Sequence, residues 1–150
     1  MLWRALLAFL ALPGIVAIAL PGWFAAAELR SGHGFHPVGL LPLLGGLGLL
    51  LWCVREFYVS GKGTLAPWSP PKHLVASGPY RFSRNPMYVA VCLMLIGWAA
   101  AFASGRLALY CVIVVVAFQL RVVYGEEPWL ARTHGGAWDE YRGRVPRWLL

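Results

Sequence analysis

Four apolar stretches run along the chain, separated by segments rich in glycine, proline and charged residues. They cover approximately residues 6–24, 38–58, 87–102 and 107–123, and a helix needs roughly 20 apolar residues to cross a bilayer core. Between the third and fourth stretches, Ser104-Gly105 is a turn signal, so we expect these two to form a helical hairpin. The pattern predicts an all-α, polytopic membrane protein with about four transmembrane helices.

Composition supports a lipid environment. The chain has 150 residues, of which 59% are hydrophobic and 13% charged, whereas soluble domains average about 25% charged residues. This length predicts one domain over residues 1–150. Cys53, Cys92 and Cys111 each lie inside an apolar stretch without metal-ligand spacing, so we predict neither a disulfide framework nor a metal site.

The basic residues suggest an orientation in the membrane. The net charge of +7 comes from residues that flank apolar stretches, which favours anionic membrane lipids over nucleic acid as the partner. With four spans, only Arg30 and Arg106 fall on one side, and the other side collects Arg4, Arg55, Lys62, Lys72, Arg81, Arg84, Arg121, Arg132, Arg142, Arg144 and Arg147. The positive-inside rule therefore predicts a multi-pass protein with both termini and the middle loop in the cytoplasm. Nothing in the sequence indicates an obligate protein partner.

The middle loop, residues 59–86, is one of two places where polar side chains gather. Its repeated glycines and prolines exclude a long helix and favour turns with accessible backbone groups. Gly78-Pro79 predicts a tight turn, and the helix that starts after Asn85 offers free N–H groups to an anion. Composition alone favours the plainer interpretation, a basic and aromatic loop at the membrane interface.

The segment after Tyr124 is the second such place. Glu126 and Glu127 follow an apolar span, where adjacent carboxylates are costly unless they are paired or solvated. On local grounds a binding role and a helix-capping role are equally supported. The rest of the tail predicts a short amphipathic helix at the interface, broken at Gly135-Gly136. Because the predicted topology puts loop and tail on one face, residues 72–88 and 121–147 are expected to form one pocket that opens to lipid.

Several motifs in order resemble a known family. Leu-Val-Ala-Ser-Gly-Pro-Tyr-Arg-Phe-Ser-Arg-Asn-Pro-Met-Tyr at 74–88, an apolar hairpin, Glu126-Glu127, and Tyr-Arg-Gly-Arg-Val-Pro-Arg at 141–147 are similar to the isoprenylcysteine carboxyl methyltransferases and their phospholipid methyltransferase relatives. The resemblance covers about residues 72–150. One departure is Asn85 in Arg84-Asn85-Pro86, where the family usually has histidine; a hydrogen-bonding role survives this change, but a titrating one does not.

The resemblance implies an S-adenosyl-L-methionine-dependent methyltransferase, with Glu126 holding the ammonium of the cofactor's methionine part. The residues that it implies for cofactor binding are Lys72, His73, Leu74, Val75, Gly78, Tyr80, Asn85, Pro86, Met87, Tyr88 and Glu126. Arg121 lies near the family's substrate-side arginine, with a shifted spacing to Glu126, and it is our catalytic candidate together with Glu127.

The methyl acceptor is implied to be lipid-like, isoprenoid or prenylated. A carboxylate acceptor needs no general base, whereas a phospholipid amine must first lose a proton. Because few well-placed bases are present, with His73, His134 and Glu127 as the candidates, carboxylate O-methylation is slightly favoured. Phospholipid amine N-methylation and a non-catalytic membrane scaffold with the same fold are the alternatives.

Overall fold

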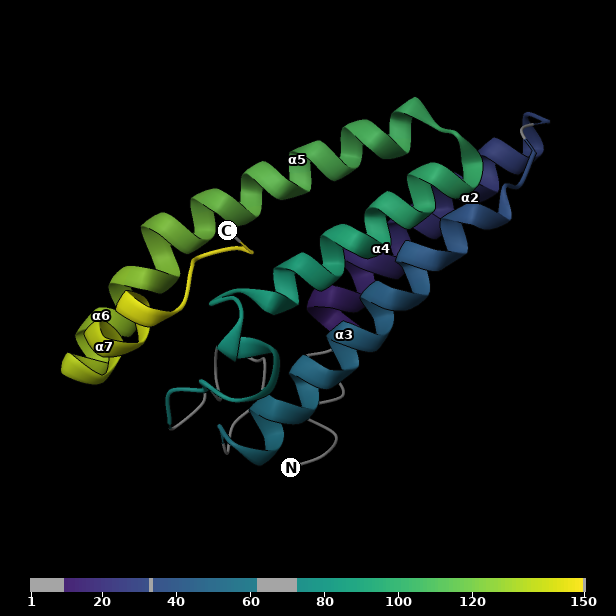
Figure 1. Cartoon of the computed structure of the whole chain (residues 1–150). Coiled ribbons are helices and arrows are strands. Elements are labelled where there is room, and N and C mark those ends of the chain that lie inside the picture. The colour runs from purple at the N-terminus through teal and green to yellow at the C-terminus, as the bar shows by residue number, and fades with distance from the viewer. Residues whose placement is uncertain (1–9, 33, 62–72, 150) are drawn as a thin grey trace.

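The chain folds into packed helices, with a compact loop and two short helices at one end (Figure 1). The computed structural model describes residues 10–32, 34–61 and 73–149, and this part of the chain contains no β-strand. The elements are a π-helix η1 (Leu10–Ala19), α2 (Leu20–Arg30), η2 (Pro37–Gly39), α3 (Leu40–Val59), η3 (Gly78–Arg81), α4 (Pro86–Phe102), α5 (Gly105–Arg121), a π-helix η4 (Val122–Glu126), α6 (Glu127–His134) and α7 (Gly136–Arg144).

Three of the four predicted spans coincide with helices, within three residues at each predicted boundary. Among the residues that the structure describes, two helical stretches are long and apolar enough to cross a membrane, Pro37–Val59 and Gly105–His134, and Pro86–Phe102 is a shorter apolar helix. The first predicted span is displaced, because its helical residues continue through α2 to Arg30, and residues 6–9 lie outside the described part. The prediction of four spans remains a prediction.

The closest helix pair is α3 and α4, and glycines allow it. A Cβ atom on Gly46 would lie 2.6 Å from the carbonyl oxygen of Ala90, and one on Gly97 would lie 2.6 Å from the Cβ of Leu43. Between helices in lipid, small residues permit this close backbone approach, which increases van der Waals contact. The pair therefore packs closely, and η1, α2 and α5 pack against α4.

The first helical segment is attached to α4 and α5 by side-chain hydrogen bonds. Pro21 lacks an N–H group, so one helical donor to the preceding turn is missing. The indole Nε1 of Trp98 donates to the carbonyl of Ala17 at 2.9 Å, and the Tyr110 hydroxyl donates to that of Val16 at 3.0 Å. Neighbouring helices thus supply donors to the carbonyls of this turn, as a lipid environment favours.

The α4–α5 turn lies at the end of the molecule away from α6 and α7 (Figure 1). Ala103 has a left-handed conformation with φ 46°, and the Ser104 hydroxyl caps α5 by accepting from the N–H of Leu107. Buried Glu28 accepts from the Ser104 hydroxyl at 2.6 Å and pairs with Arg106 at 3.1 Å. These contacts make the expected hairpin and join it to α2.

The tail contains the break that the sequence predicts at Gly135-Gly136, because α6 ends at His134 and α7 begins at Gly136. The helix of α5 continues through η4 into α6, and Gly135, with φ 50°, then turns the chain into α7. On α7, Trp138 and Tyr141 are buried, and they pack with Leu74 and Leu130. The tail therefore folds as two helices, and α7 covers the loop that precedes α4.

Candidate functional site

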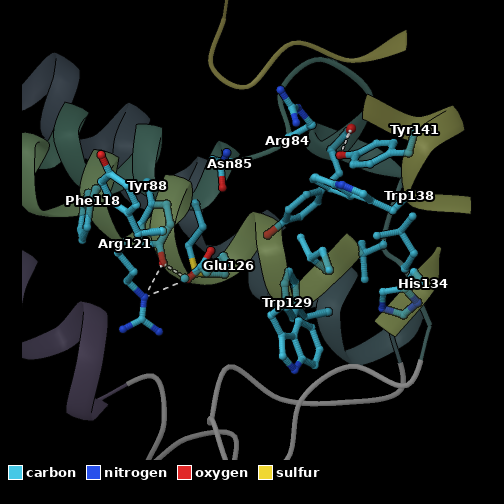
Figure 2. A pocket seen from close by; sticks show the side chains of 18 of the residues that line it. Arg84, Asn85, Tyr88, Phe118, Arg121, Glu126, Trp129, His134, Trp138 and Tyr141 are labelled. Atoms are coloured by element: carbon cyan, nitrogen blue, oxygen red, sulfur yellow. Dashed lines mark hydrogen bonds and ion pairs between the residues drawn. The ribbon is translucent and has the colours of Figure 1, made fainter. Parts of the chain in front are cut away.

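A cavity of about 890 Å³ lies between this loop, the ends of α4 and α5, and the tail helices. Figure 2 shows its side chains converging from these elements. It brings together most of the predicted site residues, which line it as follows: His73, Leu74, Val75, Tyr80, Asn85, Met87, Tyr88, Arg121 and Glu126. Loop and tail residues thus share one cavity, as the predicted pocket requires.

Three predicted site residues, Gly78, Pro86 and Glu127, are not among the described residues that line the cavity. A fourth, Lys72, lies outside the described residues. Gly78 has φ 56°, and a Cβ atom there would lie 2.7 Å from the Cγ of Glu56, so its position calls for glycine on structural grounds. Pro86 is the first residue of α4, where a missing N–H costs nothing. The binding roles of Gly78 and Pro86 and the catalytic role of Glu127 remain predictions.

The polar centre of the cavity is a triad of Tyr88, Arg121 and Glu126 (Figure 2). The Arg121 Nε donates to the Glu126 Oε1 at 2.8 Å and to the Tyr88 hydroxyl at 3.0 Å, and the Tyr88 hydroxyl also donates to Glu126. The Tyr88 ring stacks on Phe118 with ring centroids 4.3 Å apart. Side chains from α4 and α5 therefore orient the Glu126 carboxylate.

The spacing of Arg121 and Glu126 is explained by the π-helix η4. In an α-helix, residues five apart point in directions about 140° apart. Here the Glu127 N–H bonds to the Val122 carbonyl, and this i to i+5 pattern brings Arg121 and Glu126 onto one face. The spacing that looks shifted in the sequence is therefore compatible with direct contact in the structure.

Tyr80 forms a buried part of the cavity wall. It is 5% exposed, its ring lies 5.4 Å from that of Phe57, and its carbonyl accepts from the Tyr141 hydroxyl at 2.8 Å. Burial raises the pKa of both phenols well above the usual value, so both remain protonated donors at neutral pH. Glu56 fixes the start of the η3 turn that contains Tyr80, because its carboxylate accepts a hydrogen bond from the Ser77 hydroxyl at 2.6 Å.

The Glu127 carboxylate forms ion pairs with two arginines and is not part of the cavity lining. The Arg84 Nη1 atom lies 2.9 Å from the Glu127 Oε1, and Arg147 makes a bidentate contact with Glu127, with both hydrogen bonds at 2.9 Å. This hydrogen bonding raises the pKa of Arg147. Because the three residues come from the loop, from α6 and from the segment after α7, the cluster closes the loop onto the tail.

Asn85 is a second connection between loop and tail. Its Nδ2 donates to the Arg147 carbonyl at 3.0 Å, beside a bond from the Arg84 N–H to the Pro146 carbonyl at 2.9 Å. The amide thus has a hydrogen-bonding role that needs no titratable group.

We expect Asn85→Ala to lower the melting temperature in detergent by a few degrees, because one partly buried hydrogen bond contributes about 1 kcal/mol. We expect Asn85→His, which restores the histidine usual in the resembled family, to lose less stability, because imidazole still donates. Thermal unfolding monitored by circular dichroism measures both variants. An Asn85→Ala variant with wild-type stability contradicts the proposed connection.

Sequence reasoning missed several cavity residues. Trp129, Trp138 and Tyr141 come from the tail, Arg84 from the loop, and Val16 from the first helical segment. The alternation of aromatic and charged residues in the tail was a signal for the first three, but it suits an interfacial helix equally well. Nothing local marks Val16 as a cavity residue, because it lies within an apolar stretch.

The helices thus carry, at one end, a cavity that both polar and apolar side chains line. A model of the phospholipid methyltransferase family matches residues 36–137, and the chain belongs to this family. It is thus a membrane-associated methyltransferase, and members of its family generally use S-adenosylmethionine. Searches of curated proteins and of solved structures give no match.

The extent of the family match corrects one expectation. The motifs in the sequence place the resemblance at residues 72–150, whereas the match starts at residue 36 and so includes α3. It ends at residue 137, before Tyr141 and the Arg147 segment. Helix α3 carries Phe57, which lines the cavity, and Glu56, which holds the loop, so part of the site is built on this helix.

Proposed function

We propose that this protein uses S-adenosylmethionine to methylate a lipid-like or isoprenoid acceptor that reaches the cavity from the membrane. The observation that carries the proposal is the composition of the cavity wall. The same cavity is lined by the Glu126 carboxylate and by apolar side chains of the helices, namely Val16, Met87, Val91, Phe118 and Leu120. A polar cofactor and an apolar acceptor chain can therefore meet in one space.

The side chains of the cavity fit the proposed cofactor. Glu126 is a charged acceptor for an ammonium group, and Trp129 and Trp138 offer aromatic surfaces. The volume of about 890 Å³ lies within the range of small-molecule and cofactor sites. The cofactor supplies a methyl group on a sulfonium leaving group. The protein then has to align the acceptor with that methyl group and exclude water.

The charges around the cavity favour an anionic acceptor. Arg84, Arg121 and Arg132 line it, and among the described lining residues only Glu126 carries a carboxylate. A carboxylate acceptor is attracted to this environment and needs no base, and Arg121 is the arginine in contact with Glu126. We therefore favour carboxylate O-methylation.

Phospholipid amine N-methylation is the second candidate, and the family description supports it. A phospholipid carries an anionic phosphate beside its amine, so the arginines suit it as well. His73 and His134 line the cavity and are candidate bases for the amine proton.

We propose a multi-pass topology with the cavity and both termini in the cytoplasm. The separation of charges in the structure supports it. Arg106 pairs with Glu28 beside the α4–α5 turn, whereas Arg84, Arg121 and Arg147 lie around the cavity at the other end. The positive-inside rule assigns the more basic end to the cytoplasm.

Methyl transfer in lipid vesicles tests the function. We expect radiolabel from S-adenosylmethionine to enter an organic-soluble product with a prenylated cysteine, a free isoprenoid acid or phosphatidylethanolamine as acceptor. Mild alkali separates the two chemistries, because it releases a methyl ester as volatile methanol, whereas an N-methyl group stays on a non-volatile head group even when the acyl esters are cleaved. Volatile label supports O-methylation, and non-volatile label supports N-methylation. A folded protein that labels none of the three supports the scaffold.

A further inference from the structure

Arg84 is held in the cavity wall with one hydrogen-bond donor unused. Its side chain is 13% exposed and lines the cavity. Among the residues that the structure describes, the buried Nε atom has no hydrogen-bond partner. Buried polar groups in native proteins are nearly always satisfied, and a ligand in the cavity that Arg84 lines is a candidate partner for this donor. Arginine has only donors, and a negatively charged acceptor makes the stronger, charge-assisted hydrogen bond with it.

The charge balance around Arg84 indicates the same kind of partner. Arg84 and Arg147 share the one carboxylate of Glu127, at 2.9 Å from each. Two guanidinium groups against one carboxylate leave the cluster with a net charge of +1, and the Glu127 and Arg84 side chains are mostly shielded from water, at 17% and 13% exposure. A second anion at this point would balance the excess charge.

The guanidinium group is also fixed in place. Its carbon atom lies 5.4 Å from the centroid of the Trp138 ring, and Trp138 is buried. The Arg84 N–H bonds to the Pro146 carbonyl at 2.9 Å. A cation held by an aromatic ring, a carboxylate and its own backbone loses little entropy when it binds a ligand.

We propose that Arg84, backed by Arg147, is an oxyanion subsite that binds a carboxylate or phosphate group of a ligand in the cavity. The subsite rests on the proposed function for the identity of that ligand. Two sources have this chemistry, the carboxylate of the cofactor's methionine part and the phosphate of a phospholipid acceptor. Arg84 carries the subsite because it lines the cavity, whereas Arg147 and Glu127 set its position and charge.

The test compares wild type with Arg84→Gln and Arg84→Lys. The Lys variant keeps the charge and contact with Glu127 but lacks the Nε donor. Arg81→Gln is the matched control, because Arg81 is an exposed arginine of the same loop that does not line the cavity. Calorimetry measures binding of S-adenosylhomocysteine and of 5′-methylthioadenosine, which lacks the aminocarboxylate. The KM for phosphatidylethanolamine and the thermal stabilisation by inorganic phosphate are measured in parallel.

If the cofactor supplies the anion, Arg84→Gln weakens S-adenosylhomocysteine binding by roughly tenfold to a hundredfold, the range for a hydrogen bond to a charged group. Binding of 5′-methylthioadenosine then stays within about twofold of wild type. If the phospholipid acceptor supplies the anion, Arg84→Gln binds both nucleosides as wild type does. Its KM for the phospholipid rises, and its thermal stabilisation by phosphate is lost. In each case Arg84→Lys has a smaller effect in the same direction, and Arg81→Gln has none.

Equal weakening of both nucleosides by Arg84→Gln would mean a merely structural role and would overturn the subsite. An unchanged result in every measurement would overturn it as well. A folded wild-type protein that binds neither nucleoside refutes the proposed function. In that case the thermal stabilisation by inorganic phosphate tests the subsite. Stabilisation that depends on Arg84 supports the subsite, and absence of stabilisation refutes it.

Discussion

Replacement of Glu126 by glutamine is expected to reduce S-adenosylmethionine binding by more than tenfold while the fold is retained. The glutamine keeps the shape and one oxygen acceptor but removes the negative charge that would hold an ammonium group, and hydrogen bonds to charged groups contribute about 1.5–3 kcal/mol. The change also leaves Arg121 without its ion-pair partner, since its Nε lies 2.8 Å from Glu126. Calorimetry on detergent-purified protein, with S-adenosylhomocysteine as a second ligand, measures the loss.

The matched control for this variant is Glu140→Gln. Glu140 is an exposed acid of α7, with 72% of its side chain accessible, and it pairs with Arg144 four residues on. An exposed pair of this kind contributes little to stability, so the control should bind the cofactor as wild type does. If Glu126→Gln binds as tightly as the control, Glu126 does not hold the ammonium group.

A large loss of stability is expected from Gly46→Ala in α3. The new Cβ atom would lie 2.6 Å from the Ala90 carbonyl oxygen and 2.8 Å from the Met94 backbone nitrogen, so α3 and α4 must move apart. Overpacking of this kind costs about 1–3 kcal/mol. Because contacts with backbone atoms cannot be relieved by a rotamer change, we expect the upper part of that range. We expect a melting temperature lower by roughly ten degrees.

The neighbouring glycine provides the control for this prediction. A Cβ atom on Gly45 meets no atom within 4 Å, so Gly45→Ala changes only the helix propensity, which favours alanine by about 1 kcal/mol. Gly45→Ala should therefore be neutral or stabilising, opposite in sign to Gly46→Ala. If both variants behave alike in thermal unfolding, the close packing of α3 on α4 does not limit stability.

Some features of the cavity could be predicted from the sequence, and others could not. The two polar segments, 72–88 and 121–147, were identified because glycine, proline and paired acids interrupt an apolar chain. The sequence did not predict that Glu127 forms ion pairs with Arg84 and Arg147, because these partners lie 43 and 20 positions from it along the chain. Adjacent carboxylates look equivalent in the sequence, and only the direction of each side chain on the helix separates them.

The sequence by itself determined the helices and the segments that carry the chemistry. Apolar length, turn residues and the order of motifs are local properties, so the helices near 38–58, 87–102 and 107–123 and the family could be derived from them. The tertiary structure decided which side chains meet. The π-helix η4 aligns Arg121 with Glu126, and the turn at Gly135 folds α7 over the loop so that Tyr141 reaches Tyr80. Both depend on helix phase and long-range packing, which no local pattern of residues encodes.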